Sequence, residues 1–415
     1  MMVSKTVLDN GVSVISEKVS HVRSISVGVW VKCGSRHEDE ITNGTAHFVE
    51  HMLFKGTKSR SAFEIASAID SVGGMMNAFT GKETTAFYIT IPDYHLPLAI
   101  DLLADIFKNS RFEARGIGRE KAVVLQEIRM LEDSPDEYIH DFFEAALWSN
   151  HPLGLPILGT EERVKSFTRK SLIRFFRTRY GGGNVVLTAA GNLNHDVLMR
   201  LVRKAFGSLG NGAVDEKRGP PEILPKVTVL EKDLEQVHLV IGVPAPSTAS
   251  PQRYAGLLMN VVLGGSMSSR LFQEIRENRG LAYEIHSYLI PYSDTGMLGI
   301  YVGTGRENIR KVVRLILKEL DRMASELLTK KELHAVKELA KGNLLLGMES
   351  MESRMTRLAR NEICYGRHIT AEEAVERIEA VSAREIRSLA GELFNPAAIS
   401  LAAMGNVSAE DLKLP

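Results

Sequence analysis

The feature that most constrains this chain is an internal repeat that spans its two halves. The segment SVGVWV around Gly28 resembles LVIGVP around Gly242, and VVLTAAGNLNHD around Gly191 resembles AISLAAMGNVSAED around Gly405. The offset in residue number between the two glycines is the same in both pairs, and the pairs lie near opposite ends of the repeated unit. A repeat of this length indicates duplicated domains, each with strands at its start and end and helices between them.

The stretch LGNGAVDEKRGPPEILPK, residues 209–226, predicts a linker between the two copies because it mixes glycine, proline and charge without periodicity. A chain of 415 residues is also too long for one ordinary core. We therefore expect an α+β fold with two homologous domains, each a mostly antiparallel sheet packed against helices. The expected N-terminal domain is 1–210, the linker is 211–226 and the C-terminal domain is 227–415.

Charge and composition exclude several classes of protein. Fifty-one Lys and Arg residues balance fifty-one Asp and Glu residues, so the chain lacks the strongly positive field that nucleic acid or an anionic membrane requires. No segment approaches the roughly 18 apolar residues of a membrane span, and the N-terminus alternates like a strand, without the apolar run of a signal peptide. Cys33 and Cys364 form no disulfide or metal-binding pattern. We expect a cytoplasmic protein that binds neither nucleic acid nor membrane.

Local signals place several elements of the first half. Residues 45–54 carry apolar side chains at near-helical spacing. Residues 61–64, SAFE, have the form of a capping box that opens a helix, which the glycines at 73–74 close. The stretch MNAFTGKETTAFYITI predicts a hairpin, and a longer helix is expected over 113–132.

The first of these helices contains the sequence HFVEH, residues 47–51. On a helix His47 and His51 lie one above the other, and Glu50 projects from the adjoining edge of the same face. Neutral imidazole suits zinc, and catalytic zinc usually takes three protein ligands and leaves the fourth position to water. The order H-x-x-E-H is the inverted form of the common zinc-protease helix. The pattern predicts a zinc site with a third ligand from elsewhere in the chain, and the competing interpretation is a chance pair of surface histidines.

The helix expected over 113–132 supplies candidate carboxylates. Glu120 and Glu127 are two helical turns apart, so they face the same way from a helix whose Val123, Val124 and Leu125 contribute to a core. Taken alone, each glutamate is more simply a solvated surface residue, because carboxylates on helices usually stay exposed.

Ordered motifs extend the pattern over nearly the whole chain. They are GTAHFVEHMLFKGT, SVGGMMNAFTGKETTAFY, VVLQEIRMLEDSPDE and SSRLFQEIRENRGLAYEI, and Glu127 belongs to the third of them. With these motifs the sequence resembles the pitrilysin or insulinase family of inverted zinc peptidases. The resemblance is greatest to the short members similar to mitochondrial processing peptidase and their bacterial relatives.

This resemblance implies roles for named residues. His47, His51 and Glu127 are expected to bind one Zn²⁺ per chain. Glu50 is expected to be the general base that takes a proton from the attacking water, with Glu120 as a second catalytic carboxylate beside the ligand helix.

The resemblance also implies a substrate-binding strand. Asn77, Ala78 and Phe79 are similar to the segment where an extended peptide adds itself to the sheet edge through main-chain hydrogen bonds. The alternative on sequence alone is an ordinary hairpin arm with Phe79 in a core.

The second half repeats the fold without the metal. When the offset that relates Gly28 to Gly242 is applied to His47, His51 and Glu127, the equivalent positions are Val261, Gly265 and Lys341. None of these three residues reproduces the site. One catalytic centre per chain is therefore expected.

Arg276 and Tyr283 in the second half resemble the family's pair that holds the substrate and the developing oxyanion from the opposite wall of a closed chamber. Without the resemblance, Arg276 is more simply a helix-surface cation and Tyr283 a half-buried strand aromatic.

These features together predict a zinc endopeptidase that acts on unfolded or short peptides. Because the metal motif and the Arg276 segment share one polypeptide, we expect a homodimer. The main alternative is a noncatalytic peptide-binding or scaffold subunit of the same fold, which would not need Glu50. A zinc hydrolase of non-peptide amides is disfavoured by the strand-addition segment at residues 77–79.

Overall fold

The computed structural model describes residues 2–212, 219–223 and 225–412. The chain divides into two compact units. Unit 1 comprises Met1–Met130, Leu155–Arg218 and Leu346–His368, and unit 2 comprises Leu131–Gly154, Gly219–Leu345 and Ile369–Pro415. Each half of the chain therefore gives one segment to the unit that is built mainly from the other half. The expected division into domains 1–210 and 227–415 does not include this exchange of segments. The expected linker, 211–226, lies partly outside the described residues.

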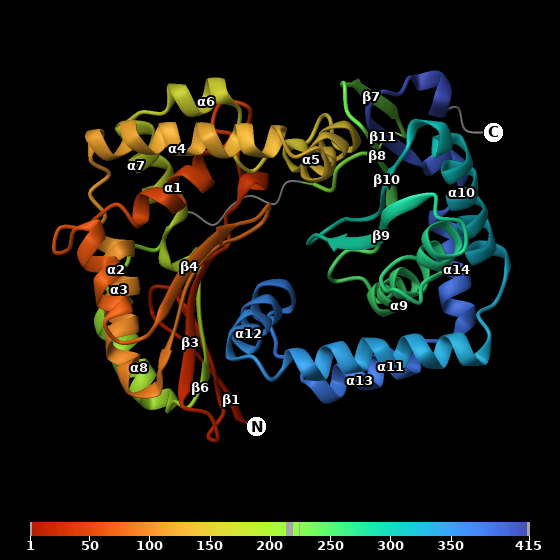
Figure 1. The fold of residues 1–415 in the computed structure, drawn as a ribbon. Coiled ribbons are helices and arrows are strands. Elements are labelled where there is room, and N and C mark those ends of the chain that lie inside the picture. The colour runs from red at the N-terminus through yellow and green to blue at the C-terminus, as the bar shows by residue number, and fades with distance from the viewer. Residues whose placement is uncertain (1, 213–218, 224, 413–415) are drawn as a thin grey trace. The chain divides into compact units, whose positions relative to one another are not determined.

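Unit 1 is built on one mixed sheet of six strands (Figure 1). The strands are Met2–Val7 (β1), Ser13–Lys18 (β2), Ser24–Val31 (β3), Met75–Thr80 (β4), Thr85–Pro92 (β5) and Val185–Gly191 (β6). They lie in the order β1-β2-β6-β3-β5-β4, and every neighbouring pair is antiparallel except β2 and β6. The predicted hairpin is confirmed as β4 and β5, and β4 forms one edge of the sheet.

Helices cover both faces of this sheet. The helices of unit 1 are Thr45–Leu53 (α1), Ala62–Asp70 (α2), Leu96–Asn109 (α3), Ala114–Glu132 (α4), Glu161–Ser166 (α6), Arg169–Arg179 (α7), His195–Phe206 (α8) and Met351–Tyr365 (α12). Val29 and Phe87 face a large core shared with α1, α3 and α8, whereas Trp30 faces the other side, where α12 supplies Met355 and Leu358 (Figure 1). Alternate strand residues point to opposite faces, so both sides of the sheet are apolar.

Unit 2 contains a mixed sheet of five strands with the same plan. The strands are Val227–Glu231 (β7), Val237–Pro244 (β8), Ala282–Pro291 (β9), Gly296–Thr304 (β10) and Ser400–Gly405 (β11). Their order is β7-β11-β8-β10-β9, with β7 and β11 parallel and the other pairs antiparallel. This matches β2-β6-β3-β5-β4 strand for strand, so the predicted α+β duplication is confirmed.

The helices of unit 2 also lie on both faces of its sheet. They are Pro135–Leu147 (α5), Arg253–Leu263 (α9), Ile309–Ser325 (α10), Ala371–Ala380 (α13) and Ala383–Leu393 (α14), and Lys330–Gly347 (α11) begins here and ends in unit 1. Leu239 and Ile241 pack with α9, α10 and α14. Val240 and Tyr301 face the other side, where α5 supplies Phe143.

The helices α5 and α12 are equivalent in the repeat and are exchanged between the units. The offset that relates Gly28 to Gly242 carries α5 onto residues 349–361, which overlap α12. In the first half α5 follows α4 but packs on β8 and β11 of unit 2, and in the second half α12 follows α11 but packs on β3 and β6 of unit 1. Each sheet is thus closed on one face by a helix from the other half of the sequence.

The structure explains why glycine stands at the repeated positions, and the explanation is the same in both halves. A Cβ at Gly28 would lie 2.8 Å from the Sδ of Met355, and a Cβ at Gly242 would lie 2.4 Å from a ring carbon of Phe143. These two glycines let the exchanged helices approach the strands closely. Gly191 and Gly405 have φ values of 135° and 132°, a backbone conformation that favours glycine.

The predicted helices of the first half agree with α1, α2 and α4 within one or two residues at their ends. The capping box is present, because Ser61 accepts from the backbone of Glu64 and Glu64 accepts from the backbone of Ser61. Among the described residues, no helix combines the length and apolar character that crossing a membrane requires.

Candidate metal centre

The helix α1 presents two histidines and a glutamate from a mostly buried scaffold. Phe48 and Val49 are fully buried in the core of unit 1, which fixes the rotation of the helix about its axis. His47 and His51 are four residues apart, and their ring centroids are 4.5 Å apart. His47 and Glu50 are each 9% exposed, so their polar groups lie below the molecular surface and not on an open helix face.

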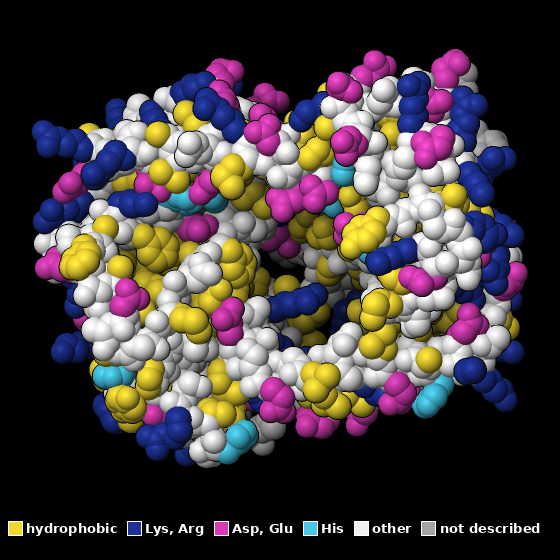
Figure 2. All heavy atoms as spheres, in the orientation of Figure 1, with side chains coloured by type: hydrophobic (Ala, Val, Ile, Leu, Met, Phe, Trp, Pro, Cys, Tyr) yellow, Lys and Arg dark blue, Asp and Glu magenta, His cyan; other side chains and the backbone are white. Residues whose placement is uncertain are grey.

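The helix α4 brings two carboxylates to the histidines. The Oε2 of Glu127 lies 3.8 Å from the Nε2 of His47 and 3.6 Å from the Nε2 of His51. The Oε1 of Glu120 lies 2.8 Å from the Nδ1 of His51, and Glu120 is only 3% exposed. The expectation that helix glutamates stay solvated therefore does not hold for Glu120. Figure 2 shows histidine side chains at the surface of unit 1, below the region where Figure 1 places α4.

These three residues fit a zinc ion. One ligand atom from each of His47, His51 and Glu127 lies within 4.8 Å of the others, and this is the one group of its kind in the described part of the chain. Zinc bonds of about 2.1 Å in a tetrahedron place ligand atoms about 3.4 Å apart, close to the two distances from Glu127. The Oε2 of Glu127 is buried and has no hydrogen-bond partner among the described residues, so it is available as a ligand.

The surroundings of the two imidazoles differ. Burial, with the nearby charge of His51, lowers the pKa of His47 to about 3, so His47 is neutral at pH 7. Burial also lowers the pKa of His51, but the hydrogen bond with Glu120 and the charges of Glu127 and Glu120 outweigh burial and raise it. Glu120 orients His51 through Nδ1 and leaves Nε2 on the side of Glu127, the arrangement usual for metal-binding histidines.

Glu50 lies beside the candidate ligands and is held by a strand. The hydroxyl of Thr80, the last residue of β4, donates to the Oε2 of Glu50 at 2.5 Å. Burial raises the pKa of Glu50 above its ordinary value. A carboxylate that is buried, oriented and adjacent to two imidazoles is suited to accept a proton.

The three residues expected to bind substrate lie on the edge strand. Asn77, Ala78 and Phe79 belong to β4, which pairs with β5 on one side only. Phe79 is 42% exposed, and its ring contacts that of Trp30 edge-on at a centroid distance of 5.7 Å. Phe79 is therefore only partly buried, with one side of its ring packed against Trp30. The edge of β4 is placed to accept an added strand.

Arg276 and Tyr283 are brought together in unit 2. The Arg276 guanidinium lies 4.7 Å from the ring centroid of Phe272 and 5.0 Å from that of Tyr283. Arg276 lies in a π-helix, Phe272–Glu277, a form often found at functional sites. Tyr283 is 78% exposed, more than the half-buried strand residue that its position alone predicts. These two residues lie in unit 2, whereas the histidine cluster lies in unit 1.

Sequence patterns missed two residues that contact this centre. Thr80 binds Glu50, and the Nζ of Lys55 lies 2.8 Å from the Oε2 of Glu120. No short-range spacing links Thr80 to the histidines, and Lys55, although four residues after His51, lies beyond the end of α1. The one available signal was that both residues fall inside the quoted motifs.

A third residue that sequence patterns missed supports the ligand helix. Glu38, which is 1% exposed, accepts hydrogen bonds from the backbone of Gly44 and Ala46 at the start of α1. It lies outside the quoted motifs, so no signal in the sequence pointed to it.

Comparison with known proteins shows which family the chain resembles. Residues 13–161 match the family described as insulinase (peptidase family M16), and residues 166–339 match the peptidase M16 inactive domain. The chain is 42% identical over 393 residues to the uncharacterized zinc protease YmxG of Bacillus subtilis, covering 95% of this chain and 96% of that protein. It is 34% identical over 394 residues to an uncharacterized zinc protease of Rickettsia bellii, covering 95% of each.

Two solved structures share the fold. A protease from Helicobacter pylori has a TM-score of 0.89 at 22% identity, covering 97% of this chain and 99% of that one. A peptidase M16 inactive domain from Pseudomonas fluorescens has a TM-score of 0.91 at 19% identity, covering 98% and 99%. The match to the M16 inactive domain, residues 166–339, includes Val261 and Gly265, the positions equivalent to His47 and His51. With its ordered motifs, its duplicated sheets and relatives similar over nearly their full length, the chain belongs to the insulinase family of peptidases, family M16.

Proposed function

We propose that the protein is a zinc-dependent endopeptidase that hydrolyses peptide bonds in unfolded or short peptides within an enclosed chamber. The observation that carries the proposal is the convergence of His47, His51 and Glu127 beside the buried carboxylate of Glu50. His47, His51 and Glu127 would hold one zinc ion per chain. When bound, zinc supplies a Lewis acid that acidifies water and polarises the scissile carbonyl.

Side chains beside the candidate zinc ligands would transfer the proton from the attacking water to the leaving amine. Thr80 occupies the Oε2 of Glu50, which leaves Oε1 to accept a proton from the attacking water and later to deliver it to the leaving amine. Glu120 would keep the Nδ1 of His51 engaged, so that the ring cannot rotate away.

Substrate would bind as an additional strand along β4. Main-chain groups at Asn77, Ala78 and Phe79 would align an extended peptide, which suits unfolded segments better than folded proteins. Arg276 and Tyr283 would supply a cation and a phenol to the substrate and to the developing negative charge. A homodimer and a cytoplasmic location are part of the same proposal, and light scattering of the purified chain would measure the former.

The decisive experiment compares the wild type with Glu50→Gln. Turnover of a quenched peptide library and zinc content are measured on the same samples. We expect equal zinc content and a loss of turnover of at least about a hundredfold, the range for removal of a general base. Equal turnover in both proteins would remove Glu50 from the mechanism.

The same comparison tests the noncatalytic alternative. A peptide-capturing subunit would bind the library in both forms and cut it in neither. A wild type that binds peptide and zinc without any turnover would favour that alternative.

A further inference from the structure

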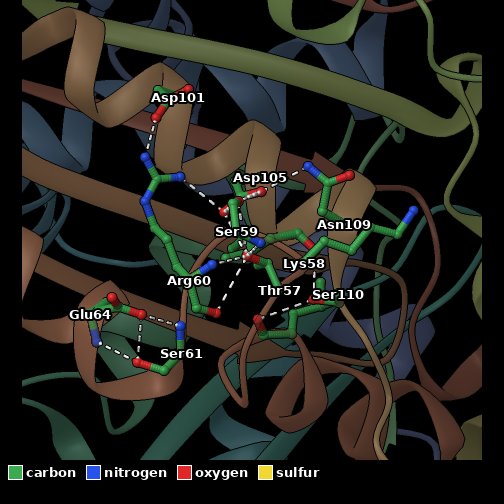
Figure 3. Close-up of polar contacts among 12 residues, drawn as sticks. Thr57, Lys58, Ser59, Arg60, Ser61, Glu64, Asp101, Asp105, Asn109 and Ser110 are labelled. Carbon is green, nitrogen blue, oxygen red and sulfur yellow. Dashed lines mark hydrogen bonds and ion pairs between the residues drawn. The ribbon is translucent and has the colours of Figure 1, made fainter.

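The loop after α1, residues 54–61, is fixed to α3 by one buried carboxylate. Asp105, which is 6% exposed, accepts hydrogen bonds from Thr57 at 2.7 Å, Ser59 at 2.8 Å, Arg60 at 2.9 Å and Asn109 at 2.7 Å (Figure 3). Figure 3 shows the side chains of the loop converging on this carboxylate. The loop is therefore a rigid support and not a flexible connection.

Lys55 stands at the start of this loop and reaches the metal centre. Its backbone N–H donates to the carbonyl of Met52, and the next residue, Gly56, accepts from the backbone of Arg111. The Nζ of Lys55 lies 2.8 Å from the Oε2 of Glu120. The other oxygen of Glu120 lies 2.8 Å from the Nδ1 of His51.

Glu120 is thus held at both oxygens. Its side chain is only 4% exposed, so loss of either partner leaves a buried carboxylate oxygen without its hydrogen-bond or ion-pair partner. A carboxylate released on one side can change rotamer, and the orientation of His51 then loses its constraint.

We propose that Lys55 is a positioning residue of the metal centre, which holds Glu120 in the orientation that fixes His51 for metal binding. The inference rests on the proposed function in so far as His51 is a zinc ligand. Lys55 itself touches neither histidine through any described contact, and it acts through Glu120.

The simpler interpretation is an ordinary surface ion pair. The Lys55 side chain is 39% exposed, and exposed pairs contribute about 0–1 kcal/mol to stability. A surface pair would leave the affinity for zinc unchanged. A measurement of zinc affinity therefore distinguishes the two interpretations, whereas a measurement of folding stability does not.

The experiment measures the zinc dissociation constant by competition with a chromophoric chelator. Lys55→Met is compared with Lys58→Met, a matched control because Lys58 lies exposed in the same loop and its side chain points away from Asp105 (Figure 3). We expect Lys55→Met to weaken zinc binding about 10- to 100-fold, the range for loss of a group that orients a ligand. Lys58→Met should equal the wild type, and Lys55→Arg should restore most of the affinity.

A double mutant shows whether Lys55 acts through Glu120. In the Glu120→Gln background, Lys55→Met should cause no further loss of zinc affinity, because both changes break the same linkage. Lys55→Gln serves as a second variant if Lys55→Met does not fold.

Three results separate the possible failures. Equal zinc affinity in the Lys55 variants and the wild type would overturn the inference while leaving the proposed function intact. Fully additive losses in the double mutant would also overturn it. A wild type that binds no zinc would instead refute the proposed function.

Discussion

Glu38 anchors the start of α1, the helix that carries the candidate zinc ligands His47 and His51. The N-cap of α1 is Gly44, with φ of 84°, and has no side chain to accept from the first turn. The Glu38 carboxyl takes that place, accepting from the backbone of Gly44 at 2.8 Å and of Ala46 at 2.5 Å. The position of His47, one residue further on, depends on these two bonds.

Removal of this carboxyl should destabilise α1 at the candidate metal centre. Glu38→Ala leaves two buried backbone N–H groups without these acceptors, which costs about 1–3 kcal/mol. We expect that loss in the free energy of unfolding by urea titration, together with weaker zinc binding. Glu40→Ala, an exposed neighbour, is the control and should change neither quantity.

Glu38 also predicts a pH dependence of stability. Burial raises the pKa of Glu38 to about 8, above the value of an unfolded glutamate, so its stabilising contribution is present at low pH and is lost as pH rises through about 8. Glu38→Gln, which cannot ionise, should lose less stability between pH 6 and pH 9 than the wild type. An identical loss in both proteins would contradict the assignment.

The local part of the candidate site was predictable from sequence, and its supports were not. Helical periodicity alone places His47, Glu50 and His51 on one side of α1. The candidate third ligand, Glu127, required the family resemblance, because no rule of spacing relates α1 to α4. Thr80 and Lys55 contact the site across tertiary distances that a single sequence does not encode.

The loop between α1 and α2 depends on α3 through Asp105. Burial raises the pKa of Asp105, but hydrogen bonds from Asn109, Thr57, Ser59 and Arg60 outweigh burial and lower it. Its contribution to stability is therefore present above the unfolded pKa, near 4, and is lost as pH falls through the lower folded value.

Asp105→Asn should detach this loop. We expect a loss of about 2–3 kcal/mol in the free energy of unfolding, because a buried charged acceptor is replaced by a neutral amide. Asp101→Asn is the matched control, since Asp101 binds the same Arg60 but is 61% exposed, and its loss should stay below about 1 kcal/mol. Equal losses in the two variants would refute the prediction.

The packing of α5 against the sheet of unit 2 also depends on pH. The Nδ1 of His140 in α5 is hydrogen-bonded to the hydroxyl of Tyr288 in β9 at 2.8 Å. Burial and the charge of His286 lower the pKa of His140 to about 4, so neutral His140 stabilises the fold above pH 6.5 and this contribution is lost towards pH 4. The other ionisable groups that interact with His140 are Asp136, His286 and Tyr301.

Acid should therefore loosen α5. We expect the wild type to lose about 1–3 kcal/mol of stability through His140 between pH 7 and pH 4.5. His140→Gln should show a correspondingly smaller decrease, whereas His21→Gln, at an exposed site, should match the wild type. Urea titrations at the two pH values measure the difference, and parallel curves for all three proteins would exclude His140 as the cause.

At the scale of the whole molecule, the internal repeat predicts the two sheets but not the exchange of α5 and α12 between the units. Strand patterns and the constant offset between the repeated glycines predicted two equivalent α+β units. Amphipathic periodicity shows that α5 and α12 have apolar faces, but not which sheet those faces cover. The sequence shows that Gly28 and Gly242 are repeated. It does not show that these glycines allow the exchanged helices to approach the strands closely.

The exchange predicts how the two halves behave as separate polypeptides. Residues 1–212 lack α12, so the sheet face bearing Ile15 and Trp30 would be uncovered, and residues 219–415 lack α5. We expect each fragment alone to aggregate or bind a hydrophobic dye, and the coexpressed fragments to copurify and bind zinc. A fragment 1–212 that is monomeric, unfolds cooperatively and binds no dye would refute this.

The reciprocal placement of α5 and α12 has a consequence for ancestry. If the gene arose by fusion of two copies, the half-length ancestor would seat the helix equivalent to α5 and α12 on another molecule of itself. Such an ancestor would be an obligate swapped pair, with two identical candidate metal centres. Fusion of the two copies would make the association independent of concentration and would remove selection on the ligand positions of one copy, where valine and glycine stand at positions 261 and 265.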